Sequence, residues 1–391
     1  MLAHNQSASA KATNARSDIN GYVFEVDKNN LENTQLTPLI YTSALLKNEV
    51  VLSVDKFALT ANNISYGITG DSLGYWRFFP KTTIVAEQVN TETDWGRLPV
   101  MGFADVVTSN NPEIKIGDRV FGFMPMATHI KILTGRINDH GFSDISPHRQ
   151  GLSPLYSAFE YVEGNPFYQP KNENFEILVR GLFLTSWLVD DFMHDNHYFG
   201  ASQYLITSAS SKTSIALAFA IKQRGKLTTT GITSASNQAF VKSLACYDHV
   251  ITYDAITDLD PRVNSILVDM AGSTKILKAI HYHFTDKLHY SCRIGATHHG
   301  DMLSADLALT LNLPGAIPRF FFAPTQLKKR TNDWGANKTM HKIGISLLSY
   351  INFCRLTMTV QHTTDRAKIV DIYQEVLSGQ TDASIGQIIS L

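Results

Sequence analysis

Short runs in which apolar and polar residues roughly alternate fill the first third of the chain, from Gly21 to Ile132. Glu49–Leu59 (EVVLSVDKFAL) is one example, and Val100–Ile132 holds two such pieces around a turn at Gly117–Asp118, followed by a third. Because alternation with a period of two is typical of half-buried strands, this region predicts a small β-barrel. The next stretch, Ile132–Glu176, is dense in Gly, Pro, His and Asn and predicts a long loop or insertion.

The apolar residues change to a helical period from Phe175 onward. Phe175–Phe199 predicts a helix that stops before Gly200. The strands predicted after it are Tyr204–Thr207, Leu227–Ile232, Val250–Tyr253, Ser265–Met270 and Leu288–Gly295, and the helices are Ser211–Gln223, Asn237–Leu244 and Lys275–Phe284. Strands that alternate with helices in this way are typical of a parallel, doubly wound sheet, so the fold class is α/β.

The two ends of the chain are less regular. Met1–Asn20 is rich in Ala, Ser and Asn and is expected to be a flexible arm. Arg319–Phe322 predicts an edge strand or a subunit contact, and a mixed segment follows it. The chain closes with a predicted helix at Thr364–Ser378 and a predicted strand at Ser384–Leu391.

Composition excludes several classes of protein. The 391 residues contain 34 Lys and Arg against 35 Asp and Glu, a net charge of −1, so no electrostatic case for nucleic-acid binding exists. Hydrophobic residues make up 44%, which excludes a disordered chain, and the length suits two or three domains. No run reaches the roughly 20 apolar residues of a membrane span. Three widely spaced cysteines favour a reducing, cytoplasmic location over a disulfide framework.

The first turn of a doubly wound sheet normally cradles a dinucleotide, because backbone N–H groups and the helix N-terminus favour the pyrophosphate. Here that turn is Thr207–Ser214 (TSASSKTS), which contains no glycine and so lacks the usual G-x-G-x-x-G pattern. It still offers hydroxyls and one ammonium to a phosphate: Ser208, Ser210, Ser211, Thr213 and Lys212. The alternative is a polar helix cap without a ligand. A nucleoside-triphosphate loop is disfavoured, since Ile206 and Ser211 occupy its glycine positions.

The residues after the second predicted strand select the cofactor. An acid there bonds the adenosine ribose, whereas neutral or basic groups accommodate a 2′-phosphate. Thr233, Ser234 and Asn237 are neutral donors and no carboxylate is near, which favours NADP(H) over NAD(H). A solvated loop without any cofactor is the alternative.

Several motifs carry a resemblance to known proteins. The β-rich first half, the Gly-Asp-Arg-Val run that ends at Val120, the βαβ half and the closing helix and strand resemble the medium-chain dehydrogenase/reductase superfamily. More closely, Ala61–Asp71 (ANNISYGITGD), Tyr75–Pro80 (YWRFFP), Ser208–Thr213 (SASSKT) and Thr233–Asp254 look like an uncharacterised family known only as a domain of unknown function. That family brings no substrate with it.

The resemblance implies a Rossmann-type parallel sheet and a β-rich, GroES-like barrel. On this basis residues 181–324 form the dinucleotide-binding domain, residues 21–180 and 325–391 the barrel domain, and residues 1–20 the arm. The glycines of the superfamily's turn fall on Ser208, Ser211, Lys212 and Ser214, so its grip on a pyrophosphate is altered or weaker. Further cofactor positions implied by the layout are Tyr253, Ala271, Gly272, Gly295, Ala296 and Thr297.

The resemblance also bears on metal and catalysis. Met101–Phe103 stands where zinc-binding members carry Gly-His-Glu, so no metal is expected. Zinc-free members of similar layout reduce quinones or activated alkenes with NADPH, and their asparagine falls on Asn62, with Tyr66 close behind. An asparagine and a tyrosine can hold the substrate oxygen and supply its proton. Both residues could instead be structural, with Asp71, Tyr75 and Trp76 packing or shaping the cleft.

Other constellations carry less. His281 and His283 lie two apart on a predicted helix and do not share a face, which argues against a metal pair, whereas His298 could lie near a nicotinamide. Asp190–Asp191 is interpreted as a solvated cap or surface pair rather than an acid–base pair. The first hypothesis is therefore an NADP(H)-dependent, zinc-independent oxidoreductase that acts on a small carbonyl, quinone or enone. The resemblance implies a homodimer, because in similar proteins a strand at the position of Phe320–Phe322 pairs across a dimer. The second is a ligand-binding sensor on the same fold.

Overall fold

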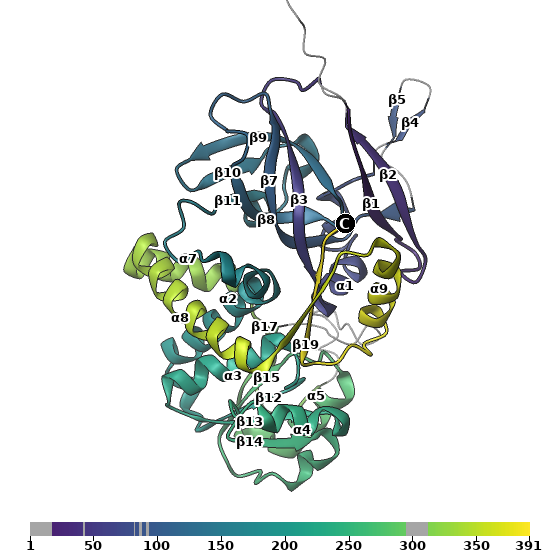
Figure 1. The fold of residues 1–391 in the computed structure, drawn as a ribbon. Helices are drawn as coiled ribbons and strands as arrows, with labels where there is room; N and C mark the ends of the chain where they lie inside the picture. Colours follow the sequence, from purple (N-terminus) through teal and green to yellow (C-terminus); the bar gives the residue numbers. More distant parts are fainter. Residues whose placement is uncertain (1–17, 42–43, 82, 86–87, 91–93, 295–311) are drawn as a thin grey trace, which may run out of the picture.

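The computed structural model describes residues 18–41, 44–81, 83–85, 88–90, 94–294 and 312–391, and everything below concerns these residues. Two β-rich bodies lie one above the other (Figure 1). The upper body is a barrel built from the first half of the chain and its last strands, and the lower body is a parallel sheet. None of the described helices is long and apolar enough to cross a membrane.

An eight-stranded sheet forms the barrel. Its order is β18-β19-β3-β7-β8-β11-β10-β9, and β3 also pairs with β9, which closes the sheet on itself. Its strands are β3 (Glu49–Leu59), β7 (Pro99–Ser109), β8 (Arg119–Pro125), β9 (His129–Asn138), β10 (Gly141–Asp144), β11 (Ala158–Tyr161), β18 (Thr359–Thr363) and β19 (Ile385–Ile389). The side chains that point inward are apolar and buried, as the period of two requires.

Smaller elements surround the barrel. A second sheet has the order β2-β1-β6, and β4 pairs with β5. These strands are β1 (Ile19–Asp27), β2 (Thr34–Tyr41), β4 (Thr83–Val85), β5 (Gln88–Asn90) and β6 (Trp95–Gly96). Two short helices, α1 (Ala61–Ile68) and α9 (Ile369–Leu377), contact each other beneath the barrel.

The interpretation of Ile132–Glu176 as a long loop or insertion was wrong for three parts of it, which are strands of the barrel. Strand β9 continues to Asn138, and β10 and β11 then join the barrel. The rings of Phe142 and Phe159 stack across these two strands at 5.6 Å and are buried. Each added strand has only four residues, which is too short for alternation to stand out among the turn residues.

The parallel sheet confirms the predicted Rossmann-type fold. Six strands run in the order β14-β13-β12-β15-β16-β17, so the first strand in sequence lies at the centre and the order reverses beside it. The strands are β12 (Gln203–Ile206), β13 (Thr228–Thr233), β14 (His249–Thr252), β15 (Ser265–Asp269), β16 (Leu288–Arg293) and β17 (Pro318–Phe320). The intervening helices are α3 (Lys212–Arg224), α4 (Gln238–Ser243) and α5 (Thr274–Phe284).

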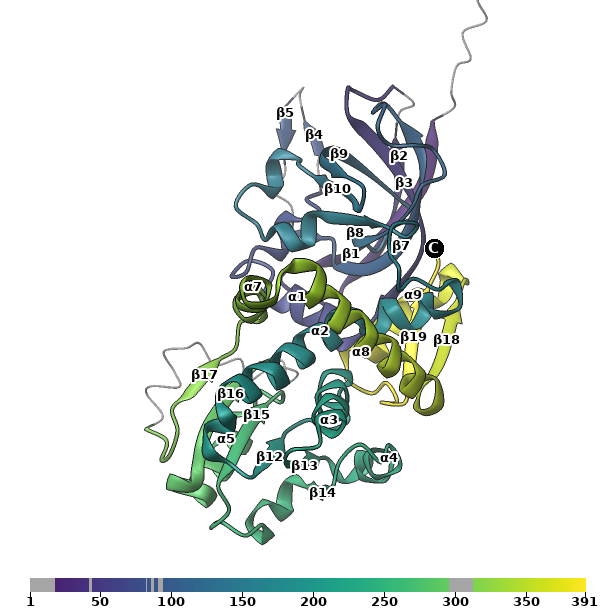
Figure 2. The ribbon, with the colours of Figure 1, turned by 90° about the vertical axis from the view of Figure 1, so that its left-hand side faces the viewer.

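Three longer helices lie between the barrel and the parallel sheet (Figure 2). They are α2 (Glu173–Asp195), α7 (Ala323–Trp334) and α8 (Ala336–Thr357), and α2 packs against α3, α7, α8 and the barrel strands β3 and β7. The sequence pattern predicted α2 but left α7 and α8 as a mixed segment. For α7 the reason is that it buries Gln326 and Arg330 instead of an apolar stripe, whereas α8 does bury an apolar stripe that the interpretation missed.

Those two polar residues bind Asp191, which corrects another expectation. Asp190 and Asp191 are each 2% exposed, so they are not a solvated surface pair. Arg224 Nε lies 2.7 Å from Asp190 Oδ2, and Arg330 Nε lies 2.5 Å from Asp191 Oδ2. The pairing joins residues more than thirty positions apart in the chain, and no local pattern could reveal it.

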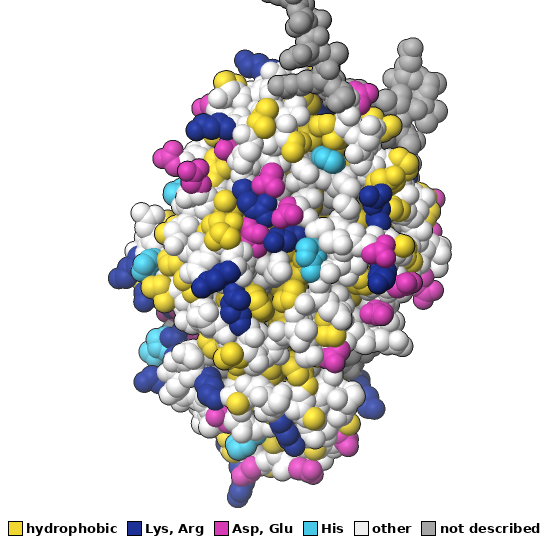
Figure 3. Space-filling view, viewed as in Figure 1, with side chains coloured by type: hydrophobic (Ala, Val, Ile, Leu, Met, Phe, Trp, Pro, Cys, Tyr) yellow, Lys and Arg dark blue, Asp and Glu magenta, His cyan; other side chains and the backbone are white. Residues whose placement is uncertain are grey.

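Arg119, from the Gly-Asp-Arg-Val run, fastens α2 to the barrel. Its guanidinium bonds Asp55 of β3, Asp105 of β7 and Glu173 at the start of α2, at 2.6 to 2.9 Å. Lys56 adds a fourth contact at 2.8 Å from Glu173. On the face seen in Figure 3, basic and acidic side chains are intermingled and neither sign forms a continuous patch.

Candidate functional site

The turn that joins β12 to α3 stands at the carboxyl edge of the parallel sheet, where ligands of such sheets bind. Ser208 has a φ of +48°, in the left-handed region that glycine normally occupies in this turn. Helix α3 then begins at Lys212, and Ser211 caps it by accepting a hydrogen bond from Ser214 N at 3.2 Å. The turn therefore combines a left-handed residue with a capped helix start, although it contains no glycine.

Two hydroxyls of the turn are used within it. Ser211 Oγ donates to Ser214 Oγ at 2.9 Å, and Ser214 Oγ donates to the carbonyl of Thr207 at 2.9 Å. Ser214 is fully buried, at the position where close packing of helix and strand usually requires glycine. Thr213 contributes its carbonyl, which accepts a bond from Ser186 at 2.8 Å.

Lys212 extends across to the barrel. Its Nζ donates to the carbonyl of Ile385, in β19, at 2.8 Å. Burial lowers the pKa of Lys212 to about 8. The ammonium therefore joins the start of α3 to the last strand of the chain.

The structure brings together the predicted cofactor residues of three neighbouring strands. Asn237 Nδ2 donates to Ser210 Oγ at 3.1 Å, and Thr233 Oγ1 lies 3.5 Å from the same oxygen. Ser208 N donates to Tyr253 Oη at 3.2 Å. Ser234, beside Thr233, contacts Ser236 Oγ at 2.9 Å. These side chains line one end of the sheet, at the ends of β12, β13 and β14.

Asp269, the last residue of β15, is a member of this edge that sequence reasoning missed. Its Oδ1 accepts bonds from Thr207 Oγ1 at 2.8 Å, Ala271 N at 3.1 Å and Gly272 N at 3.3 Å. Its Oδ2 is buried and has no hydrogen-bond partner among the described residues. Burial raises the pKa of this carboxyl. An acid directly after a buried strand (SILVD) was the signal available in the sequence.

Arg293 ends the next strand, β16, and pairs in register with Asp269. Its Nε is also buried without a partner in the described part of the chain. Because both groups end at the carboxyl edge, this side of the turn presents an acceptor and a donor that are unsatisfied. The predicted residues Gly295, Ala296 and Thr297, and His298 after them, lie outside the described residues.

The predicted catalytic pair sits on one face of α1. Asn62 Nδ2 donates to Tyr66 Oη at 2.7 Å, as their spacing of four residues allows on a helix. Burial, followed by the neighbouring Tyr156 and Tyr75, raises the pKa of Tyr66 well above its ordinary range. The phenol stays protonated because its pKa is raised, although the hydrogen bond from Asn62 by itself lowers that pKa.

Tyr156 was not predicted, and it completes a group of three tyrosines that we call the tyrosine cluster: Tyr66, Tyr75 and Tyr156. The rings of Tyr66 and Tyr75 are 4.3 Å apart, and Tyr156 lies 6.4 and 6.1 Å from them. Tyr156 stacks on Phe123 at 4.5 Å. All three are partly exposed. Tyr156 belongs to a short 3-10 turn among prolines, which gave no periodic signal.

Other residues named from the sequence have packing roles or are solvated. Trp76 is buried against Gly70 and Gly96, where any larger side chain would meet its ring. Asp71 is exposed. His281 is buried and bonds Pro314 and Ser291, whereas His283 bonds the carbonyl of Leu259. Among the described residues, no group of three or more His, Cys, Asp or Glu could hold a metal ion.

Comparison with known proteins identifies the family. The model of the family described as Protein of unknown function (DUF2855) matches residues 57–382. The chain therefore belongs to the DUF2855 family. No protein with a curated description matches it.

Solved structures confirm the architecture of this DUF2855 protein. The NADPH complex of CurA from Vibrio vulnificus is similar with a TM-score of 0.58 at 12% identity, over 93% of this chain and 96% of that one. The CurK enoyl reductase gives 0.56 at 12% identity, over 95% and 99%. The yhdH oxidoreductase from Salmonella enterica in complex with NADP gives 0.53 at 11%, over 95% and 100%. At such identities the likeness shows the fold alone, a Rossmann-type domain joined to a GroES-like barrel.

Proposed function

We propose that this DUF2855 protein is an NADP(H)-dependent, zinc-independent oxidoreductase that acts on a small carbonyl, quinone or enone. The observation that carries the proposal is the convergence at the carboxyl edge of the sheet. Residues from β12, β13, β14 and β15 meet there, and Asp269 Oδ2 is left without a partner. Similar structures that hold NADPH or NADP support this assignment.

The residues at the edge fit a dinucleotide in charge and size. The pyrophosphate would lie against the turn at Ser208–Ser211 and the start of α3, where the helix dipole favours negative charge. Ser234 and Asn237 would hold the adenosine end, and no carboxylate lies in the Thr233–Asn237 turn to repel a 2′-phosphate. Asp269 Oδ2 would accept a bond from a ribose hydroxyl or the carboxamide.

When bound, the cofactor supplies or accepts a hydride. The protein would supply the proton. Tyr66 would donate its hydroxyl hydrogen to the substrate oxygen, and Asn62 holds the phenol in place through its 2.7 Å bond. The raised pKa of Tyr66 keeps that proton available at neutral pH. The aromatic rings of the tyrosine cluster provide a flat wall for a conjugated substrate.

A titration with NADPH and with NADH, followed by nicotinamide fluorescence and thermal shift, tests cofactor binding directly. We expect saturable binding that favours NADPH, and its loss in Ser208→Asp, because the new carboxylate repels the pyrophosphate. Ser202→Asp is the matched control, since Ser202 is exposed at the opposite end of β12. Equal binding by both variants, or no binding by the wild type, contradicts the proposal.

Catalysis is tested separately with quinones, enones and aldehydes as substrates. We expect Tyr66→Phe to lower kcat by about 10²-fold or more, as for loss of a general acid, with NADPH binding unchanged. Asn62→Leu acts through Tyr66 and should lower kcat less. Tyr75→Phe serves as a control for the loss of a neighbouring hydroxyl. Wild-type turnover in an Asn62→Leu, Tyr66→Phe double variant would remove both residues from the mechanism.

A sensor protein is the second candidate, and one observation favours it. The hydroxyls of Ser211 and Ser214 are bonded within the turn and Lys212 bonds Ile385, so fewer donors face a phosphate than in a glycine loop. This candidate predicts no turnover of any substrate in the panel and a Ser208→Asp variant that behaves as the wild type.

A further inference from the structure

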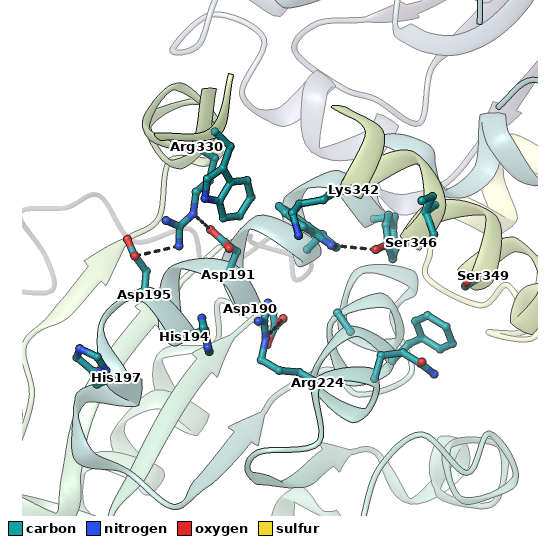
Figure 4. A pocket seen from close by; sticks show the side chains of 17 residues that line it. Asp190, Asp191, His194, Asp195, His197, Arg224, Arg330, Lys342, Ser346 and Ser349 are labelled. Carbon is teal, nitrogen blue, oxygen red and sulfur yellow. Dashed lines mark hydrogen bonds and ion pairs between the residues drawn. The ribbon is translucent and has the colours of Figure 1, made fainter. Parts of the chain in front are cut away.

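A groove runs along α2 on the side away from the dinucleotide turn, between α3 on one side and α7 and α8 on the other (Figure 4). Its volume is about 870 Å³, within the range of small-molecule sites. It contacts α3 from Phe219 to Arg224, whereas the dinucleotide turn lies at the start of that helix. Phe219 follows Lys212 by seven residues, so about 10 Å of helix separates the two sites where they come nearest.

The floor of the groove is aromatic. Trp187 of α2 and Trp334 of α7 meet edge to face at 6.4 Å, and Phe219 of α3 also lines the groove. Trp187 Nε1 donates to Ser346 Oγ of α8 at 3.3 Å, so the ring is held in one orientation. Flat apolar surfaces of this kind favour a ligand with a planar or aliphatic body.

Each acid that lines the groove already has a cation. Asp190 pairs with Arg224 at 2.7 Å, and Arg330 holds both Asp191 at 2.5 Å and Asp195 at 2.9 Å. Figure 4 shows Arg330 placed between these last two carboxylates. Asp191 and Asp195 are thus neutralised through Arg330, whereas Asp190 Oδ1 is buried without a hydrogen-bond partner among the described residues.

Two cations of the groove, by contrast, have N–H donors that are not used in an ion pair. Arg224 bonds Asp190 through Nε alone, and no other hydrogen bond of its guanidinium is found in the described chain. Lys342 is exposed, lies 5.3 Å from the ring centre of Trp334, and makes no ion pair with a described carboxylate.

We propose that the groove binds a small organic anion, with its apolar body on the Trp187–Trp334 floor and its carboxylate near Lys342 and Arg224. Arg224 is partly buried, and a cation in that setting attracts a carboxylate more strongly than one in open solvent, while Lys342 adds an exposed positive charge. The site is independent of the proposed oxidoreductase activity, because it shares no residue with the carboxyl edge of the sheet.

Two probes that share a ring system and differ in charge test the proposal: naphthoate and naphthylmethylammonium. Each is titrated into the full-length protein in saturating NADPH, and tryptophan fluorescence is followed, since two of the four tryptophans line the groove. We expect naphthoate to bind at least about tenfold more tightly than the ammonium probe, with an affinity that falls as salt is added.

Lys342→Glu should weaken naphthoate by about tenfold or more, because it reverses the charge at the mouth of the groove. Lys338→Glu is the matched control: it makes the same change at an exposed position of α8 that does not line the groove. Lys342→Gln repeats the test without adding an acid. Equal affinity for the two probes, an unchanged affinity in Lys342→Glu, or displacement of naphthoate from the NADPH-free protein by NADPH would each overturn the proposal.

Discussion

Helix α2 holds a carboxylate–arginine pair near each end, and the two carboxylates respond to their surroundings in opposite ways. At its first residue, burial tends to raise the pKa of Glu173, but hydrogen bonds from Arg119, Lys56 and Tyr168 lower it to about 2. Near its other end, burial raises the pKa of Asp190 to about 6, and the single partner Arg224 does not compensate. The number of donors, rather than the presence of an arginine, determines whether a buried acid stays charged.

The helix itself adds to this difference. A negative charge at the N-terminus of a helix is stabilised by the backbone dipole, and one near the C-terminus is destabilised. Glu173 has the first situation, and Asp190, Asp191 and Asp195 have the second. Arg330 is what allows the last two to remain together, because it is bonded to both.

Replacing Arg330 should give the largest effect. Arg330→Met leaves Asp191 buried and without its cation, so we expect a loss of about 3–5 kcal/mol in the free energy of unfolding. Lys329→Met is the matched control one residue earlier: its ammonium also bonds Asp195, but it is half exposed, and a loss below about 1 kcal/mol is expected. Urea unfolding measures both. Similar losses would mean that burial does not set the strength of these pairs.

The amino end of α2 should make the protein lose stability in acid. The pKa of Glu173 is depressed from 4.5 to about 2, so its contribution is complete above pH 4.5 and disappears as the pH falls toward 2. We expect this contribution to the free energy of unfolding to be at most about 3 kcal/mol. It is smaller once the partial exposure of the partners of Glu173 is taken into account. Glu173→Gln should flatten that part of the pH–stability curve. An unchanged slope would show that other acids dominate acid unfolding.

The other end should have the opposite slope. The pKa of Asp190 is raised from 3.8 to about 6, so its favourable contribution is complete below pH 3.8 and is lost as the pH rises through 6. We expect the free energy of unfolding to fall by about 1–3 kcal/mol over this range. Asp190→Asn should remove this dependence between pH 4 and 6 and leave the acid limb caused by Glu173 intact. If both variants changed the same limb, the contrast between the two ends would fail.

The smallest effect on stability is expected at the edge strand β17. Phe320 and Phe322 are 70% and 60% exposed there, and we propose that a second copy of the chain covers them. Phe320→Glu should shift a dimer toward monomer in light scattering and change the free energy of monomer unfolding by less than about 0.5 kcal/mol. A wild type that is monomeric at every concentration tested would contradict this proposal.

The sequence predicted what depends on local spacing. The strands of the parallel sheet are short apolar runs between helices, so a parallel, doubly wound sheet could be predicted, although not the order of its strands. Asn62 and Tyr66 bond as positions four apart on a helix do. What failed depends on distant partners. Helix α7 has no apolar stripe because its buried face binds Asp191, which lies 139 positions away from Arg330.

The residues of the candidate site also differ in whether the sequence could predict that they lie together. Ser210, Thr233 and Asn237 follow successive strands, so the shared edge of a parallel sheet brings them together. Tyr156 reaches the tyrosine cluster from a turn whose position depends on how the barrel closes, and no spacing in the sequence encodes that.

The bond from Lys212 to Ile385 joins strand β19 to the start of α3, at the turn where we propose that a dinucleotide binds. The lysine is the first residue of α3, and its ammonium is held by the backbone of the last strand. A displacement of β19 therefore moves a positive charge beside the place where a pyrophosphate would lie. Changes in the final seven residues, although they contain no predicted site residue, should alter the affinity for the dinucleotide.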